Sequence, residues 1–145
     1  MHHRKFVQHM KDNADRMYPG LTKALSNSER CKELLLVVPE EERRQDSMEV
    51  YHDLTNWLSA EADSIIEQHY VALGKRRAQQ GVPLSNTFWA VCIARDYLWE
   101  RVQQECLLED PVEFWGGVSL LRLINKFFDR VLYFALLGYE KAGSA

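Results

Sequence analysis

The sequence lacks the features that mark several protein classes. Its three cysteines, Cys31, Cys92 and Cys106, are widely spaced and form no Cys-x-x-Cys pair, which argues against a disulfide framework or structural zinc. No uninterrupted apolar run reaches the length of about 18 residues that spans a membrane, and the polar N-terminus is unlike a signal peptide. The net charge of −3 gives no basic field for nucleic acid or anionic lipid. We therefore expect a cytoplasmic protein, with Cys92 and Cys106 as buried small hydrophobes.

Catalytic motifs are missing as well. No serine stands in a Gly-x-Ser-x-Gly sequence, and no Gly-rich phosphate loop occurs. The acidic run Glu40–Glu42 suits a helix start, and the basic run Lys75–Arg77 is interpreted as a solvated helix end. We expect no enzyme activity, no cofactor and no metal site.

Helical periodicity is what the sequence does contain. Apolar residues recur every three or four positions without period-two alternation, which predicts an all-α fold of five or six helices, three of them long. The expected helices span Arg4–Met17, Glu29–Val38, Asp46–Gln80, Asn86–Leu108 and a final segment that begins after Asp110. Their expected boundary signals are Pro19-Gly20, the capping boxes Ser26–Glu29 and Asp46–Glu49, the cap Gly81 with Pro83, the cap Ser85, and Asp110-Pro111 with Glu113.

The final helix has more apolar surface than a small domain needs. Apolar residues fill an arc of roughly 180° on its helical wheel, and Leu132, Leu136 and Leu137 intrude on the opposite side. This excess predicts a second partner, most simply another copy of the chain. The expected interface and relay residues are Trp99, Val102, Trp115, Leu120, Ile124, Phe127, Phe128, Val131 and Tyr139. Gly116 and Gly117 are interpreted as a site where another helix packs closely, with a ligand against bare backbone as the alternative.

His69 is the one residue that suggests a cofactor. It falls four residues after Ile65 on the apolar stripe of the helix expected over Asp46–Gln80, where an imidazole either ligates haem iron or is a satisfied histidine of the core or its rim. The abundant aromatic residues are expected to pack in the core, and a small apolar ligand pocket among them is the alternative.

Two stretches resemble the RsbRD N-terminal domain family. The first is Leu73–Ser85, followed by Ala94-Arg95 and Leu98-Trp99-Glu100. The second holds Gly116-Gly117, Leu120-Leu121-Arg122, Asn125, Phe127–Arg130, Leu132-Tyr133 and Gly138-Tyr139-Glu140. Together they cover roughly the second half of the chain, and the first half is similar in helix order alone.

The resemblance implies a bacterial input domain with a globin-like fold that lacks haem and dimerises through its last two helices. Such domains precede an output module, such as the STAS domain of stressosome proteins, a histidine kinase or a helix-turn-helix regulator. The polar tail Lys141–Ala145 is typical of a linker, so we expect residues 1–145 to be one domain of a longer signalling protein. The prediction is a parallel homodimer that relays a packing change through Tyr139–Lys141. A haem- or ligand-binding sensor in the same frame, such as the sensor of a histidine kinase, is the alternative.

Overall fold

The structure, a computed structural model, describes residues 3–105 and 111–143, and the side chains of residues 6–104 and 120–143. The helices are α1 (His3–Ser26), α2 (Lys32–Val37), α3 (Glu40–Ala60), α4 (Glu67–Gln79), α5 (Leu84–Glu105) and α6 (Pro111–Ala142), with 3₁₀ turns at Glu29–Cys31 and Asp63–Ile65. These ranges contain no strand, so the predicted all-α class is confirmed. The globin-like arrangement stays a prediction.

Helix α1 is longer than predicted because Pro19-Gly20 does not end it. Proline lacks the N–H that would bond to the Asp15 carbonyl, which weakens the helix locally. The apolar stripe nevertheless continues beyond the proline, and burial of Leu21 and Leu25 offsets this loss. Gly20 lies against the Tyr97 ring, which a Cβ at this position would overlap. The glycine is therefore a packing contact inside a helix.

The segment expected as one helix over Asp46–Gln80 forms two helices, and the prediction was wrong at both ends of α3. This helix begins directly after Pro39, with Glu40–Glu42 in its first turn, where carboxylates favour the positive end of the helix dipole. It ends at Glu61, which adopts a left-handed conformation with φ of 50°. The break shifts the buried stripe of α4 by one residue, so that Ile66 and Tyr70 are buried while Ile65 is exposed.

The structure agrees with two of the predicted helix boundaries, Gly81 and Pro111. At the end of α4, Gly81 has a φ of 80°, and the N–H groups of Gly81 and Val82 bond to the carbonyls of Ala78 and Arg77. This is the glycine cap that was predicted. Pro111 is the first residue of α6, as predicted, whereas Asp110 lies outside the described residues.

The other predicted caps were wrong. Helix α5 begins at Leu84, one residue before the expected cap Ser85. Ser26 donates its hydroxyl to the Thr22 carbonyl instead of capping the segment that starts at Glu29.

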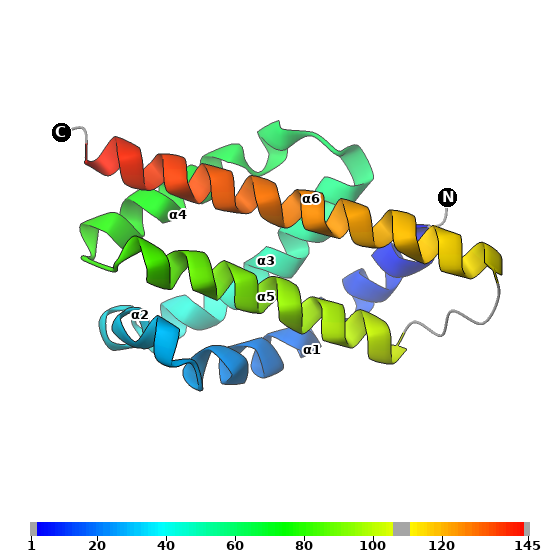
Figure 1. Cartoon of the computed structure of the whole chain (residues 1–145), viewed down its shortest axis with the longest axis horizontal. Coiled ribbons are helices and arrows are strands. Elements are labelled where there is room, and N and C mark those ends of the chain that lie inside the picture. Colours follow the sequence, from blue (N-terminus) through cyan, green and yellow to red (C-terminus); the bar gives the residue numbers. More distant parts are fainter. Residues whose placement is uncertain (1–2, 106–110, 144–145) are drawn as a thin grey trace.

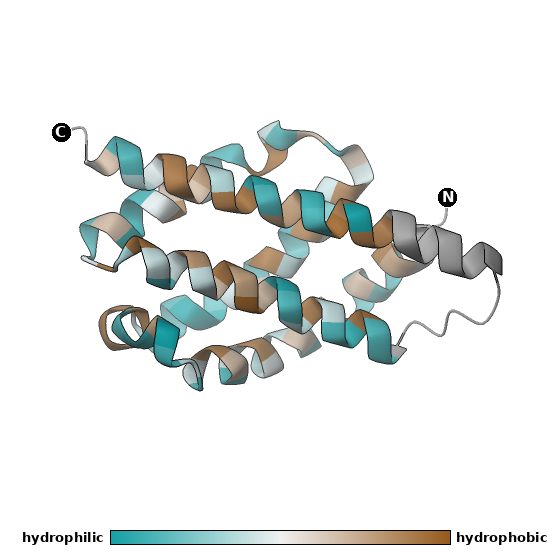
Figure 2. Cartoon of the chain, in the orientation of Figure 1, coloured by the Kyte–Doolittle hydropathy of each residue, from teal (hydrophilic) through white to brown (hydrophobic). Residues whose placement is uncertain are grey.

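Helices α5 and α6 lie side by side and run antiparallel, and α3 crosses behind them (Figure 1). Along the visible side of both helices hydrophobic and hydrophilic residues alternate (Figure 2). Between the helices lies one main core, whose largest fully buried side chains include Trp57, Tyr51, Phe127 and Phe128. A smaller apolar cluster of Leu34, Val38 and Val82 lies under α2.

Candidate functional site

Helices α3 and α4 are joined by a row of charged side chains, called here the charge ladder. Its acidic members follow one face of α3 and its basic members follow α4. They are Glu42, Asp46, Glu49 and Asp53 on α3, and His69, Arg76 and Arg77 on α4. The ladder holds together two helices that are separated by the break at Glu61.

Arg77 lies at the buried end of the charge ladder, and only 3% of its surface is exposed. Its Nη1 lies 2.9 Å from Glu42 Oε1 and 3.0 Å from Gln80 Oε1, and its Nη2 donates to Asp46. Arg76 Nε lies 2.7 Å from Glu42 Oε1. The interpretation of Lys75–Arg77 as a solvated helix end was therefore wrong for Arg77, because two carboxylates from another helix draw it into the interior.

The two carboxylates beside Arg77 have opposite pKa shifts. Burial raises the pKa of Asp46 to about 6, because the cost of desolvation exceeds the attraction of Arg77 and Arg76. Burial acts in the same direction on Glu42, but hydrogen bonds and charge from Arg77 outweigh it and lower the pKa of that carboxyl. The ladder therefore contains one carboxyl that titrates near neutral pH.

His69 lies at the other end of the ladder as a half-buried histidine with a partner at each ring nitrogen, while the buried stripe of α4 passes through Ile66 and Tyr70. Its Nδ1 is 2.7 Å from Asp53 Oδ2 and its Nε2 is 3.0 Å from Glu49 Oε2. The hydrogen bond to Asp53 raises the pKa of His69 above its usual value, against the effect of burial. Tyr70 donates its hydroxyl to the same oxygen of Asp53 at 2.7 Å. In the protonated form both ring nitrogens donate to carboxylates, and in that form neither presents a lone pair to haem iron.

Most residues predicted for the dimer interface lie in the core of the single chain. Leu120, Ile124, Phe127, Phe128 and Val131 are each exposed by 5% or less, and Val102 by 9%. Helices α3, α4 and α5 cover the apolar side of α6, which the helical wheel had predicted to be more than one small domain could bury. Trp115, Gly116 and Gly117 lie outside the residues whose side chains are described.

Trp99 and Tyr139 remain at the surface and link α6 to its neighbours. Trp99 Nε1 donates to Asn125 Oδ1 at 3.0 Å. The Tyr139 hydroxyl donates to the Val82 carbonyl at 2.8 Å and lies 2.7 Å from Thr87 Oγ1, which can donate to it. The last turns of α6 are thereby attached to the connection between α4 and α5.

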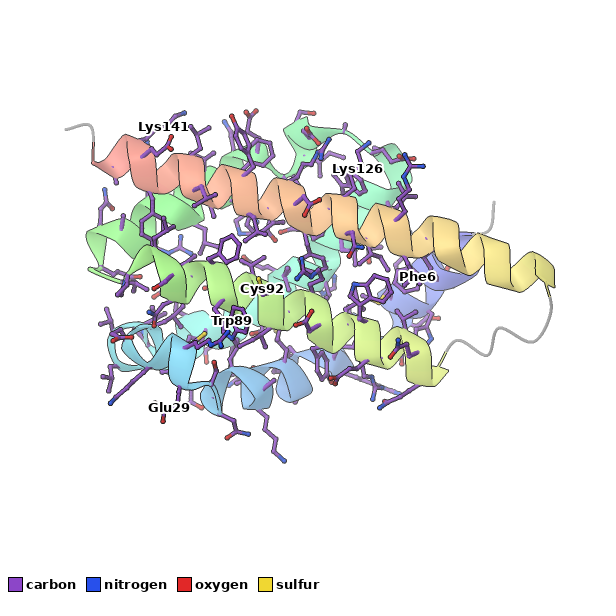
Figure 3. All side chains as sticks on the ribbon, viewed as in Figure 1. Phe6, Glu29, Trp89, Cys92, Lys126 and Lys141 are labelled. Atoms are coloured by element: carbon purple, nitrogen blue, oxygen red, sulfur yellow. The ribbon has the colours of Figure 1, made fainter. Side chains whose placement is uncertain are left out.

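A partly apolar stripe follows α5 and α6, which lie side by side in Figure 2, and is called here the α5–α6 face. Spacings of three and four residues place its members along the adjoining edges of the two helices. They are Phe88, Cys92, Arg95 and Trp99 on α5, and Leu121, Asn125, Leu132 and Leu136 on α6. Phe88 is 40% exposed, and the others except Cys92 are half-buried or exposed. Figure 3 shows Cys92 on this side of α5, while Trp89 points toward the segment that contains Arg30.

The closest helix crossing joins α4 to α6 and was missed by the sequence analysis. A Cβ on Gly74 would overlap the carbonyl oxygen of Ala135, and a Cβ on Gly138 would overlap the carbonyl oxygen of Val71. The two backbones touch because neither glycine has a side chain. Two glycines inside long helical patterns were the available signal, but close helix packing was predicted at Gly116 and Gly117 instead.

Neither a metal cluster nor a disulfide is found among the described residues. No group of three or more His, Cys, Asp and Glu side chains is placed to hold a metal ion there. Cys31 and Cys92 are buried free thiols whose pKa values are raised by burial, as expected for small hydrophobes, and Cys106 lies outside the described ranges. Within those ranges no helix has the length and apolar content to cross a membrane.

Comparison with known proteins identifies a family. The model of the family described as the RsbT co-antagonist protein rsbRD N-terminal domain matches residues 22–144. No curated protein matches the chain, and no solved structure matches it. The match covers α2 to α6 and only the last turn of α1, and it includes the charge ladder, the α4–α6 crossing and the α5–α6 face. The chain therefore belongs to the RsbRD N-terminal domain family.

Proposed function

We propose that the chain is a non-enzymatic input domain of a cytoplasmic bacterial signalling protein. It forms a parallel homodimer through the α5–α6 face and relays changes in helix packing through the end of α6 to a C-terminal output module. The family supports the regulatory class. The output is a STAS domain, a histidine kinase or a helix-turn-helix module, and an RsbT-like protein is the class of regulatory partner suggested by the family description.

The observation that carries the dimer proposal is the set of apolar side chains left exposed on the α5–α6 face. Phe88 keeps 40% of its surface, and Trp99, Leu132 and Leu136 are half-buried members of the same face. A second copy would bury these groups, and burial of apolar surface contributes about 25 cal/mol per Å² before the costs of association.

The proposed relay rests on the attachments of α6. The Tyr139 hydroxyl and the Gly138 backbone connect its last turns to α4 and to the α4–α5 connection. A change in packing at the dimer surface therefore reaches the residues that precede the proposed output. The charge ladder also supports the absence of a nucleic-acid partner, because Arg76 and Arg77 already pair with carboxylates.

Sedimentation velocity of the purified chain and of two matched variants tests the dimer. We expect twice the 17.0 kDa chain mass for the wild type. Phe88→Glu places a charge on the α5–α6 face and should weaken association at least about tenfold, equivalent to roughly 1.4 kcal/mol. Leu36→Glu is the control, because Leu36 is 77% exposed on α2, outside this face. A monomeric wild type at high concentration, or dissociation by Leu36→Glu alone, would contradict the proposal.

A further inference from the structure

A half-open cavity of about 90 Å³ lies between the helices, beside the buried end of the charge ladder. Most of its wall is apolar, and residues of all six helices contribute to it. Leu21, Leu34, Leu73, Ala94 and Val131 come from five of them. A water molecule in the liquid takes up about 30 Å³, so the space holds about three non-hydrogen atoms. The cavity therefore suits a short apolar group.

Three charged residues also line the cavity, and their charges do not cancel. Asp46 and Arg77 pair with each other, whereas Arg43 has no carboxylate partner among the described residues. Burial raises the pKa of Asp46 only to about 6, so this carboxyl is mostly ionised at neutral pH. Just outside the lining, Glu42 and Arg76 pair at 2.7 Å and add no net charge. The lining therefore carries one net positive charge.

The side chain of Arg43 is placed to receive an anion. It is half-buried, so the solvent reaches it, whereas Arg77 is buried. Its Nε donates to the Val38 carbonyl at 3.2 Å, which holds the guanidinium at the end of α2. Its two terminal nitrogens have no partner among the residues whose side chains are described. Their N–H groups lie in one plane and match the two oxygens of a carboxylate.

We propose that this cavity binds a short-chain monocarboxylate of about three carbon atoms, with its hydrocarbon end against the apolar wall and its carboxylate on Arg43. The carbon atoms fill the enclosed space, and the two oxygens lie at its open side. A monoanion balances the single unpaired positive charge, whereas a dicarboxylate would bring a second negative charge close to Asp46. A bare anion such as chloride would leave the apolar wall uncovered, and a neutral molecule would leave Arg43 without a charged partner.

Titration of the whole chain with sodium propionate at pH 7.5 and constant ionic strength, followed by NMR of leucine and valine methyl groups, tests the proposal. We expect saturable shifts at Leu34, Val50 and Val131 with a dissociation constant in the millimolar range, because few ligand atoms make contact. Leu36, which is exposed on α2, should not shift. Shifts that do not saturate, or equal shifts at Leu36, would overturn the proposal.

Three further ligands separate the charge from the hydrocarbon part. Propionamide has the shape of propionate without its charge and should bind at least about tenfold more weakly. Hexanoate should also bind more weakly, because its chain exceeds the cavity. Sodium chloride at the same concentration should not reproduce the shifts. Equal affinity for propionate and propionamide would refute the contact with Arg43, and the same shifts with chloride would refute the contact with the apolar wall.

Variants of α3 test the role of Arg43 directly. Arg43→Gln should weaken propionate binding at least about tenfold, and Arg43→Lys should weaken it less, because lysine keeps the charge without the paired donors. Arg44→Gln is the matched control, since Arg44 is 45% exposed, pairs with Glu41 and lies outside the lining. Wild-type affinity in Arg43→Gln would overturn the proposal and leave Arg43 only its contact with Val38.

These experiments keep the proposal testable if a variant is unstable. Circular dichroism and the melting temperature show whether Arg43→Gln is folded, and the comparison of propionate with propionamide on the wild type decides if it is not. The measurements report on the cavity whether or not the chain dimerises. The inference therefore succeeds or fails independently of the proposed function.

Discussion

His69 is held by two carboxylates of α3, one at each ring nitrogen. The imidazolium is the form that donates to both, and its pKa is accordingly raised. A group whose folded-state pKa lies above its unfolded value of about 6.5 stabilises the fold fully below that pH. This stabilisation is lost as the pH rises through the higher folded-state pKa.

Replacing His69 with glutamine should therefore destabilise the chain in a pH-dependent way. We expect a loss of about 1–2 kcal/mol in the free energy of unfolding at pH 5.5, and a smaller loss at pH 9. Urea denaturation at both pH values measures the difference. His52→Gln is the control, because the pair of His52 with Asp15 is at the surface and should contribute less than about 1 kcal/mol. An equal loss for His69→Gln at both pH values would count against a charged histidine in the ladder.

At the scale of the helices, the α4–α6 crossing depends on two glycines. Gly138→Ala would force its new Cβ into the backbone of α4, which cannot move aside as a flexible side chain can. We expect a loss of about 1–3 kcal/mol in the free energy of unfolding, as for overpacked cores. Gly143→Ala is the control, since its Cβ would meet only atoms at 3.6 Å and beyond. Thermal denaturation of both variants tests this, and a Gly138→Ala variant as stable as wild type would disprove the close contact.

The helices that the sequence predicted well are those with local signals. Gly81 and Pro111 mark helix boundaries by their own backbone preferences. Features decided by contacts between distant residues were not predicted. Pro19 stays inside α1 because residues beyond it are buried.

The same limit applies to the candidate site. The break at Glu61 shifts the register of α4. The predicted apolar stripe through Ile65 and His69 is therefore one residue away from the buried positions Ile66 and Tyr70. Arg77 was expected in solvent because its partners, Glu42 and Asp46, lie more than 30 residues earlier in the chain. Periodicity identified the helices, but it could not show which helix would cover each of them.

For the whole molecule, the proposed dimer couples stability to concentration. Only the folded state would associate, so mass action raises the melting temperature as the chain becomes more concentrated. We expect an increase of roughly 3–5 °C over a hundredfold range of concentration. Phe88→Glu should need at least about ten times the concentration to reach the same increase, whereas Leu36→Glu should behave as wild type. Differential scanning fluorimetry over this range provides the measurement, and a constant wild-type melting temperature would contradict a dimer.

The position of the α4–α6 crossing has a mechanical consequence. Gly138 lies near the end of α6, and about 40 Å of helix extends from it to Pro111. In the proposed relay, backbone contact would hold the helix at Gly138, and α6 would act as a lever with its fulcrum close to one end. A tilt of about 5° would displace the first turn by about 3–4 Å and the last turn by well under 1 Å. A signal leaving through the last turn would therefore be transmitted as a change of angle and not as a change of position.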